Sequence, residues 1–152
     1  MLREAIARSK ADLAGLELVR EHCALAEAHQ ATGNRHEGLE MLRRAEDLMD
    51  RTSERHWAAD LFRLKGELVL LGTPAPTVEA EGSFRQAIEV ARHQRAKWYE
   101  LRAITSLARL LRDTDRRDEA RAMLAEIYNW FTEGFDTRDL KDAKALLDEL
   151  SG

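Results

Sequence analysis

The chain has 152 residues, of which 44% are hydrophobic and 34% charged, with a net charge of −4. This length suits one domain with a sizeable core. The acidic balance argues against nucleic acid as a partner, because phosphate binding needs a basic face. No apolar run is long enough for a membrane span, and MLREAIARSK lacks the apolar stretch of a signal peptide. The single cysteine, Cys23, excludes an internal disulfide, so we expect a cytoplasmic protein.

Only helices are predicted along the chain, because helix formers such as Ala, Leu, Glu and Arg dominate it. Clusters such as TGNRHE, GTPAPTVE and DTDRRDE separate the helical stretches and predict turns. In chain order, we expect a partial helix over 1–10, helical hairpins over 13–51, 54–94 and 97–131, and a final helix over 137–150.

Four columns of residues recur in the three hairpins, at periods of 40 and 42 residues. The first helix of each hairpin carries one small residue. The second helix carries another, followed four residues later by a large apolar residue and three residues after that by a further apolar one. The columns are Ala26, Gly66 and Ala108; Gly38, Ala80 and Ala120; Leu42, Phe84 and Leu124; and Ala45, Ala87 and Ile127.

This spacing predicts where the helices touch. Two antiparallel helices pack closely only where their side chains are small, with a large apolar side chain filling the adjacent space. Intervals of four and three keep the apolar residues on one face of a helix. We therefore expect the six small residues to be buried between helices.

Both prolines, Pro74 and Pro76, fall in the turn of the second hairpin, which is two residues longer than the other turns. A proline there removes no helical hydrogen bond. Thr77 is the predicted N-cap of the next helix. We interpret the prolines as a stiff corner, with a functional hinge as the alternative.

The two ends of the chain break the repeat. Shifted by one period, Leu42 maps onto Leu2 and Ala45 onto Ala5, so 1–10 is predicted to be the end of a second helix from an upstream repeat. We therefore hypothesise that the chain is a fragment of a longer solenoid, or that the protein covers its N-terminal edge by self-association. The final helix has an apolar stripe and an opposite charged face, which is typical of a capping helix.

The column pattern resembles the tetratricopeptide repeat, and AEGSFRQAIEVA matches it best. The resemblance implies an all-α, right-handed α-solenoid of about three antiparallel hairpins. The period departs from the family value of about 34 residues. The usual tyrosine of the first helix is also replaced, by His29, Val69 and Leu111.

A narrower resemblance is carried by HWAADLFRLKGELVLL and by the ending WFTEGFDTRDLKDAKALLDEL. These stretches look like the C-terminal tails of large bacterial signalling proteins. In those proteins a class III nucleotide cyclase or a DNA-binding domain, and then a regulatory ATPase, precede tetratricopeptide repeats. The resemblance implies a regulatory module, and it transfers neither cyclase nor ATPase activity to this chain.

No motif predicts a catalytic, cofactor-binding or metal site. The phosphate-binding glycine patterns, the G-x-S-x-G motif and the HExxH motif are absent from the sequence. His22 and His29 can share a helix face near Cys23, but no third ligand is evident. We interpret Cys23 as a packing residue and expect no enzyme.

The resemblance also places a peptide-binding concave face on the first helices of the hairpins. In each hairpin the positions on this face are counted from the small residue of the first helix, which is Ala26, Gly66 or Ala108. They lie six and three residues before it, and one and four residues after it. Arg102, Arg109 and Arg112 make the C-terminal end of this face basic, which would suit an acidic peptide. The alternative is that these arginines pair with neighbouring carboxylates. The predicted binding residues are Arg20, Glu27, Asp60, Arg63, Glu67, Arg102, Arg109 and Arg112, with Cys23, Gln30, Leu70 and Thr105 between them.

The function expected from these features is non-catalytic protein–protein interaction through the concave face, with a protein or peptide partner. The alternative is a self-associating module that forms a homodimer through its N-terminal edge. A small-molecule sensor or an RNA-binding helical repeat is less favoured, because a stack of hairpins is open and the chain is acidic.

Overall fold

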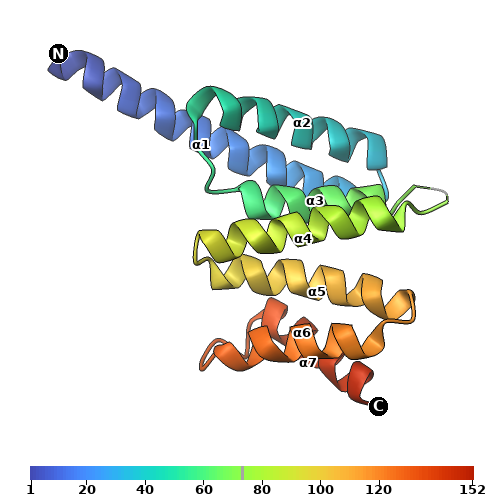
Figure 1. The fold of residues 1–152 in the computed structure, drawn as a ribbon. Helices are drawn as coiled ribbons and strands as arrows, with labels where there is room; N and C mark the ends of the chain where they lie inside the picture. Colours follow the sequence, from blue (N-terminus) through green and yellow to red (C-terminus); the bar gives the residue numbers. More distant parts are fainter. Residues whose placement is uncertain (73) are drawn as a thin grey trace.

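The computed structural model describes residues 1–72 and 74–152. Within these residues all regular secondary structure is α-helical, with seven helices and no strand (Figure 1). The predicted all-α class is confirmed. The helices are α1 (Leu2–Ala31), α2 (Arg35–Thr52), α3 (Ala58–Val69), α4 (Thr77–His93), α5 (Lys97–Asp113), α6 (Arg117–Trp130) and α7 (Arg138–Ser151).

Consecutive helices pair into hairpins that stack along the molecule (Figure 1). The hairpins are α1–α2, α3–α4 and α5–α6, and α7 packs against α6 and α5. Because α1 contacts α3, α3 contacts α5 and α5 contacts α7, these four helices share one face of the stack. The prediction of packed helical hairpins is therefore confirmed.

Helix α1 is continuous over 30 residues, so the separate helix predicted over 1–10 is wrong. The repeat columns suggested a boundary near residue 10, but ADLAGLEL contains good helix formers and no proline. Its one glycine, Gly15, costs only about 1 kcal/mol in a helix, and it lies against Thr52 at the end of α2. Residues 1–14 are all exposed and project beyond α2 (Figure 1).

The six small residues are buried, as predicted. A Cβ atom added at Gly66 would lie 2.5 Å from Cε1 of Phe84, inside the second hairpin. A Cβ atom added at Gly38 would lie 2.5 Å from Cδ2 of Leu68, between the first and second hairpins. Both distances are far below van der Waals contact, so at these points the absence of a side chain sets the spacing of the helices.

The buried side chains form two clusters that meet at α3. One cluster joins α1, α2 and α3, and the other runs from α3 to α7. Phe62 packs against both clusters and links them. Each large apolar side chain buried in this way contributes about 1.5–3 kcal/mol.

The turn between α3 and α4 contains both prolines, and Thr73 in the predicted turn lies outside the described residues. Pro76 occupies the N-cap position of α4 with φ −79°, and Thr77 is the first helical residue. The predicted N-cap at Thr77 is therefore wrong by one position. The fixed φ of proline suits this position, and the missing N–H is no loss before the first helical turn.

We predict that Gly66→Ala destabilises the protein although alanine favours helix. The added methyl group would overlap the buried ring of Phe84, and such overpacking costs about 1–3 kcal/mol. Gly82→Ala is the matched control, because Gly82 is exposed on α4 and a Cβ there meets nothing within 4 Å. It should stabilise the protein by about 0.5–1 kcal/mol. Urea denaturation of both variants measures these changes, and equal stabilisation by both would contradict close packing at Gly66.

Candidate functional site

A hollow of about 490 Å³ lies on the face formed by α1, α3, α5 and α7. Five of the eight predicted binding residues line it. Asp60 does not line it but accepts hydrogen bonds from two that do, Arg63 and Arg102. Arg20 and Arg112 lie outside the hollow. The five lining residues are Glu27, Arg63, Glu67, Arg102 and Arg109.

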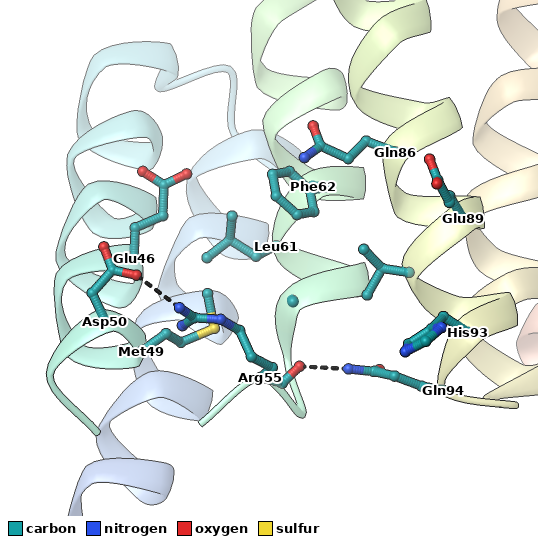
Figure 2. Close-up of a pocket in the computed structure, with 12 residues that line it drawn as sticks. Glu46, Met49, Asp50, Arg55, Leu61, Phe62, Gln86, Glu89, His93 and Gln94 are labelled. Atoms are coloured by element: carbon teal, nitrogen blue, oxygen red, sulfur yellow. Dashed lines mark hydrogen bonds and ion pairs between the residues drawn. The ribbon is translucent and has the colours of Figure 1, made fainter. Parts of the chain in front are cut away.

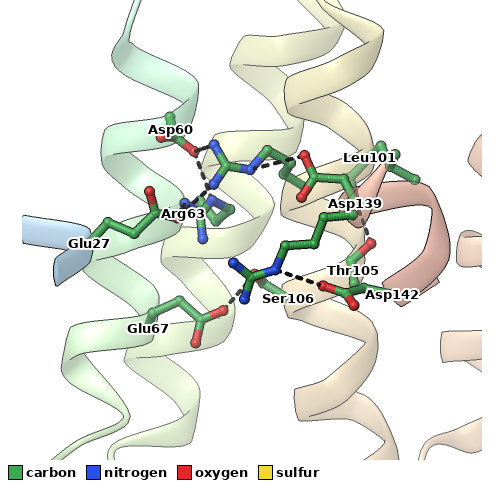
Figure 3. A network of polar contacts seen from close by, with 11 residues as sticks. Glu27, Asp60, Arg63, Glu67, Leu101, Thr105, Ser106, Asp139 and Asp142 are labelled. Carbon is green, nitrogen blue, oxygen red and sulfur yellow. Dashed lines mark hydrogen bonds and ion pairs between the residues drawn. The ribbon is translucent and has the colours of Figure 1, made fainter. Parts of the chain in front are cut away.

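An ion network crosses the floor of this hollow and joins three helices (Figure 3). Arg63 donates to Asp60 at 2.8 Å and to Glu27 at 3.3 Å. Arg102 donates to the same two carboxylates, at 3.1 Å to Asp60 and 2.7 Å to Glu27. Each carboxylate thus bridges two guanidinium groups, and the network fixes α1, α3 and α5 relative to one another.

The inner pair of the network is almost fully buried. The side chains of Arg63 and Asp60 are 9% and 7% exposed. Burial lowers the pKa of Arg63, but the charge of Asp60 and the hydrogen bond to it raise that pKa more, so the net change is upward. Removing one partner of such a pair is strongly destabilising, because it leaves an uncompensated buried charge.

Helix α7 brings carboxylates to the arginines that the sequence marked as a basic surface. Asp139 lies 3.7 Å from Nε of Arg102, and Glu149 accepts a hydrogen bond from Arg112 at 3.0 Å. Arg112 also donates to Asp113 at 2.8 Å. For Arg102 and Arg112 the structure therefore favours the alternative left open by the sequence, in which the arginines pair with nearby carboxylates.

Arg109 differs from its two neighbours. It is exposed at the hollow, and within residues 1–72 and 74–152 it takes part in no ion pair. Nearby, Glu67 accepts a hydrogen bond from Ser106 at 2.6 Å. A cation that lacks an intramolecular carboxylate remains available to an acidic group from outside.

Sequence reasoning missed the carboxylates of α7 because that helix was treated only as a cap. The signal was present in its polar face, where Asp139 and Asp142 are one helical turn apart. Both residues line the hollow (Figure 3). Helix α7 therefore contributes acidic side chains to the same hollow as the arginines of α3 and α5.

Cys23 is buried at the edge of the first cluster. Burial, with the nearby charge of Asp60, raises the pKa of its thiol to about 12. The thiol is therefore protonated at neutral pH and is a poor nucleophile, in keeping with a packing role. In the described part of the chain, no three His, Cys, Asp or Glu residues are grouped to hold a metal ion.

A second and larger hollow, of about 720 Å³, lies between α2, α3 and α4 (Figure 2). Leu61, Phe62 and Met49 line its apolar floor. At its rim, Arg55 donates to Asp50 at 3.0 Å, and its carbonyl oxygen accepts from Gln94 at 2.8 Å. These floor residues fall outside the four repeat columns, so no pattern in the sequence indicates this hollow.

Comparisons of the chain with models of known protein families, with curated proteins and with solved structures found no match. None of the helices in the described residues combines the length and apolar character that crossing a bilayer requires.

We predict that Asp60→Ala lowers the free energy of unfolding by about 3 kcal/mol, because Arg63 stays buried without its nearest partner. Glu149→Ala is the control, since it removes a partner of Arg112 at the surface and should change stability by less than about 1 kcal/mol. Denaturant unfolding at neutral pH compares the two. Similar small changes in both variants would show that the network does not fix the helices.

Proposed function

We propose that this protein is a non-catalytic protein–protein interaction module that binds a peptide segment of its partner on the face of α1, α3, α5 and α7. The observation that carries the proposal is the polar hollow in this face, whose charged groups are held by a buried ion network. Extended faces of stacked helical hairpins commonly bind peptides or protein segments.

The network favours binding because it fixes the polar groups before a partner arrives. Arg63 and Arg102 each contact two carboxylates, so their side chains lose little further freedom when a ligand binds. Ordering a long side chain at an interface costs about 0.5–1.5 kcal/mol. A preorganised surface avoids most of that cost.

We assign the roles within the predicted site as follows. Asp60, Arg63, Arg102 and Glu27 shape the floor and hold the helices together. Arg109 is the anchor for an acidic side chain or a terminal carboxylate of the peptide, because its charge has no partner within the described chain. Glu67 accepts from Ser106 through Oε1, which leaves its second oxygen for a peptide N–H group.

The type of repeat and the kind of protein that contains it are part of the same proposal. The recurring small residues, buried at each contact between helices, support a right-handed solenoid of tetratricopeptide-like repeats. The likeness of HWAADLFRLKGELVLL and of the chain ending to tails of bacterial signalling proteins supports a regulatory role in such a protein, in the cytoplasm.

The test begins with selection of peptides from a random phage-displayed library by the wild-type protein. Peptides with Asp or Glu should be enriched. Arg109→Glu should then weaken binding of a selected peptide at least about tenfold, because it removes a charge-assisted contact worth roughly 1.5–3 kcal/mol. Fluorescence anisotropy of the labelled peptide measures the dissociation constant.

Arg121→Glu is the matched control, since Arg121 is an exposed arginine on α6 without an ion pair in the described residues. It makes the same charge change away from the hollow and should leave binding unchanged. No enrichment of peptides, or equal weakening by both variants, would reject the assignment of this face. Arg102→Glu is unsuitable for this test, because it would also break the network beneath the hollow.

A further inference from the structure

The first turns of α1 form an exposed arm, which we define as Leu2–Ala14. Every residue of the arm is exposed, and none forms an ion pair with any part of the chain that the structure describes. Leu2, Ile6 and Leu13 are 77%, 48% and 60% exposed. Their intervals of four and seven place them along one side of the helix. An isolated amphipathic stretch of this kind is a surface for helix-in-groove recognition.

The charges of the arm are arranged around this apolar side. Arg3 and Lys10 are seven residues apart, so they lie one above the other beside the apolar stripe. Glu4 lies on the opposite side of the helix. A groove that accepts the arm would therefore need an apolar floor and an acidic rim.

The hollow between α2, α3 and α4, here called the α2–α4 groove, has both features (Figure 2). Its floor is apolar, with Phe62 at the junction of the two hydrophobic clusters. Its rim carries Glu46, Asp50 and Glu89 against a single arginine, Arg55. The groove is thus acidic where the arm is basic, and its volume of about 720 Å³ fits several side chains rather than one.

The corresponding gap between the next two outer helices, α4 and α6, holds a smaller hollow of about 260 Å³ and is bridged by ion pairs. There Arg85 of α4 donates to Glu119 of α6 at 2.8 Å, and Arg116 donates to Glu81 at 2.8 Å. No ion pair joins α2 to α4 in the described residues. Of the two gaps between the outer helices α2, α4 and α6, the α2–α4 groove is therefore the one that no ion pair crosses in the described residues.

We propose that the arm of a second copy of this chain docks in the α2–α4 groove. Its apolar stripe covers the floor, and the flank that carries Arg3 and Lys10 faces one of the two acidic rims, which hold Glu46 and Asp50 on α2 and Glu89 on α4. This goes beyond peptide binding by the opposite face and does not depend on it.

The position of the arm favours a closed pair in which each copy supplies one arm. A Cβ atom at Gly15 would lie 2.8 Å from Thr52, so the arm leaves the body where α2 ends. The groove is at the same end, because it includes Arg55 and the last turn of α4. The arm continues the straight helix α1 and cannot fold back into its own groove (Figure 1).

Reciprocal exchange is an isologous arrangement, which closes at two copies. An arm of this length is about 20 Å long. One arm in one groove would make a small interface, whereas exchange doubles the buried area toward the roughly 1,200–2,000 Å² of stable complexes.

The test uses two charge-reversed versions of the full chain. The arm variant carries Arg3→Glu and Lys10→Glu, and the groove variant carries Glu46→Arg and Glu89→Arg. Within residues 1–72 and 74–152, the only ion pair that these four residues make is that of Glu46 with Lys65 at 4.0 Å. Both variants should therefore fold, which circular dichroism checks. Analytical ultracentrifugation from about 1 µM to 500 µM measures self-association over the range of weak to moderate dimers.

Wild type should be a dimer in this range, and each variant alone should dissociate at least tenfold more readily. An equimolar mixture of the two should restore a 1:1 dimer, because each acidic arm meets a basic groove and each basic arm meets an acidic groove. Arg109→Glu should dimerise as wild type does, which separates this proposal from the peptide site.

Three results would overturn the proposal. One is a wild-type protein that stays monomeric throughout the range. A second is a groove variant that dimerises as well as wild type, which would move the interface to α1 itself, where Leu18 and Leu25 are also exposed. The third is a mixture that stays monomeric while each variant is folded.

Discussion

The close approach of neighbouring helices at small residues is the constraint on which the other features of this protein depend. Gly66 lets α3 lie against the ring of Phe84 within one hairpin, and Gly38 lets α2 lie against Leu68 of the next hairpin. The alanines at the matching repeat positions, Ala26, Ala80, Ala108 and Ala120, are buried as well. Because they fix the distance between helices, they also fix how α1, α3, α5 and α7 share one face, and so where their polar side chains meet.

That spacing makes the buried ion network possible. Asp60 of α3 reaches Arg102 of α5 only because the two helices are in direct contact, and Glu27 of α1 bridges to both arginines. The burial that orders these charges also makes each of them costly to remove, so one set of residues both stabilises the fold and holds the polar surface in place. On the other side of the stack, the first and second hairpins leave an apolar groove that no ion pair spans in the described residues.

The small-residue columns could be predicted from the sequence because helix packing imposes the same local pattern in every repeat. The pairing of Arg102 with Asp60 and Glu27, which are 42 and 75 residues away, could not be predicted. Their repeat positions place all three residues on one face, but they do not say which side chains on that face bond to one another. The boundary near residue 10 was predicted by extending the repeat backward, whereas local helix propensity around Gly15 decided the outcome. The α2–α4 groove is a gap between helices, and a gap leaves no pattern in the residues that border it.

A scaffold with this spacing holds fixed polar groups on an open face, which is the feature that our proposal of an interaction module uses. The close approach itself is tested most directly by proton NMR of the wild-type chain. We predict nuclear Overhauser contacts between the Gly66 Hα protons and the ring protons of Phe84, with the Gly66 signal shifted by the ring current, and contacts from Gly38 Hα to the methyl groups of Leu68. Absence of these contacts in a folded, helical protein would contradict the packing on which the whole account is built.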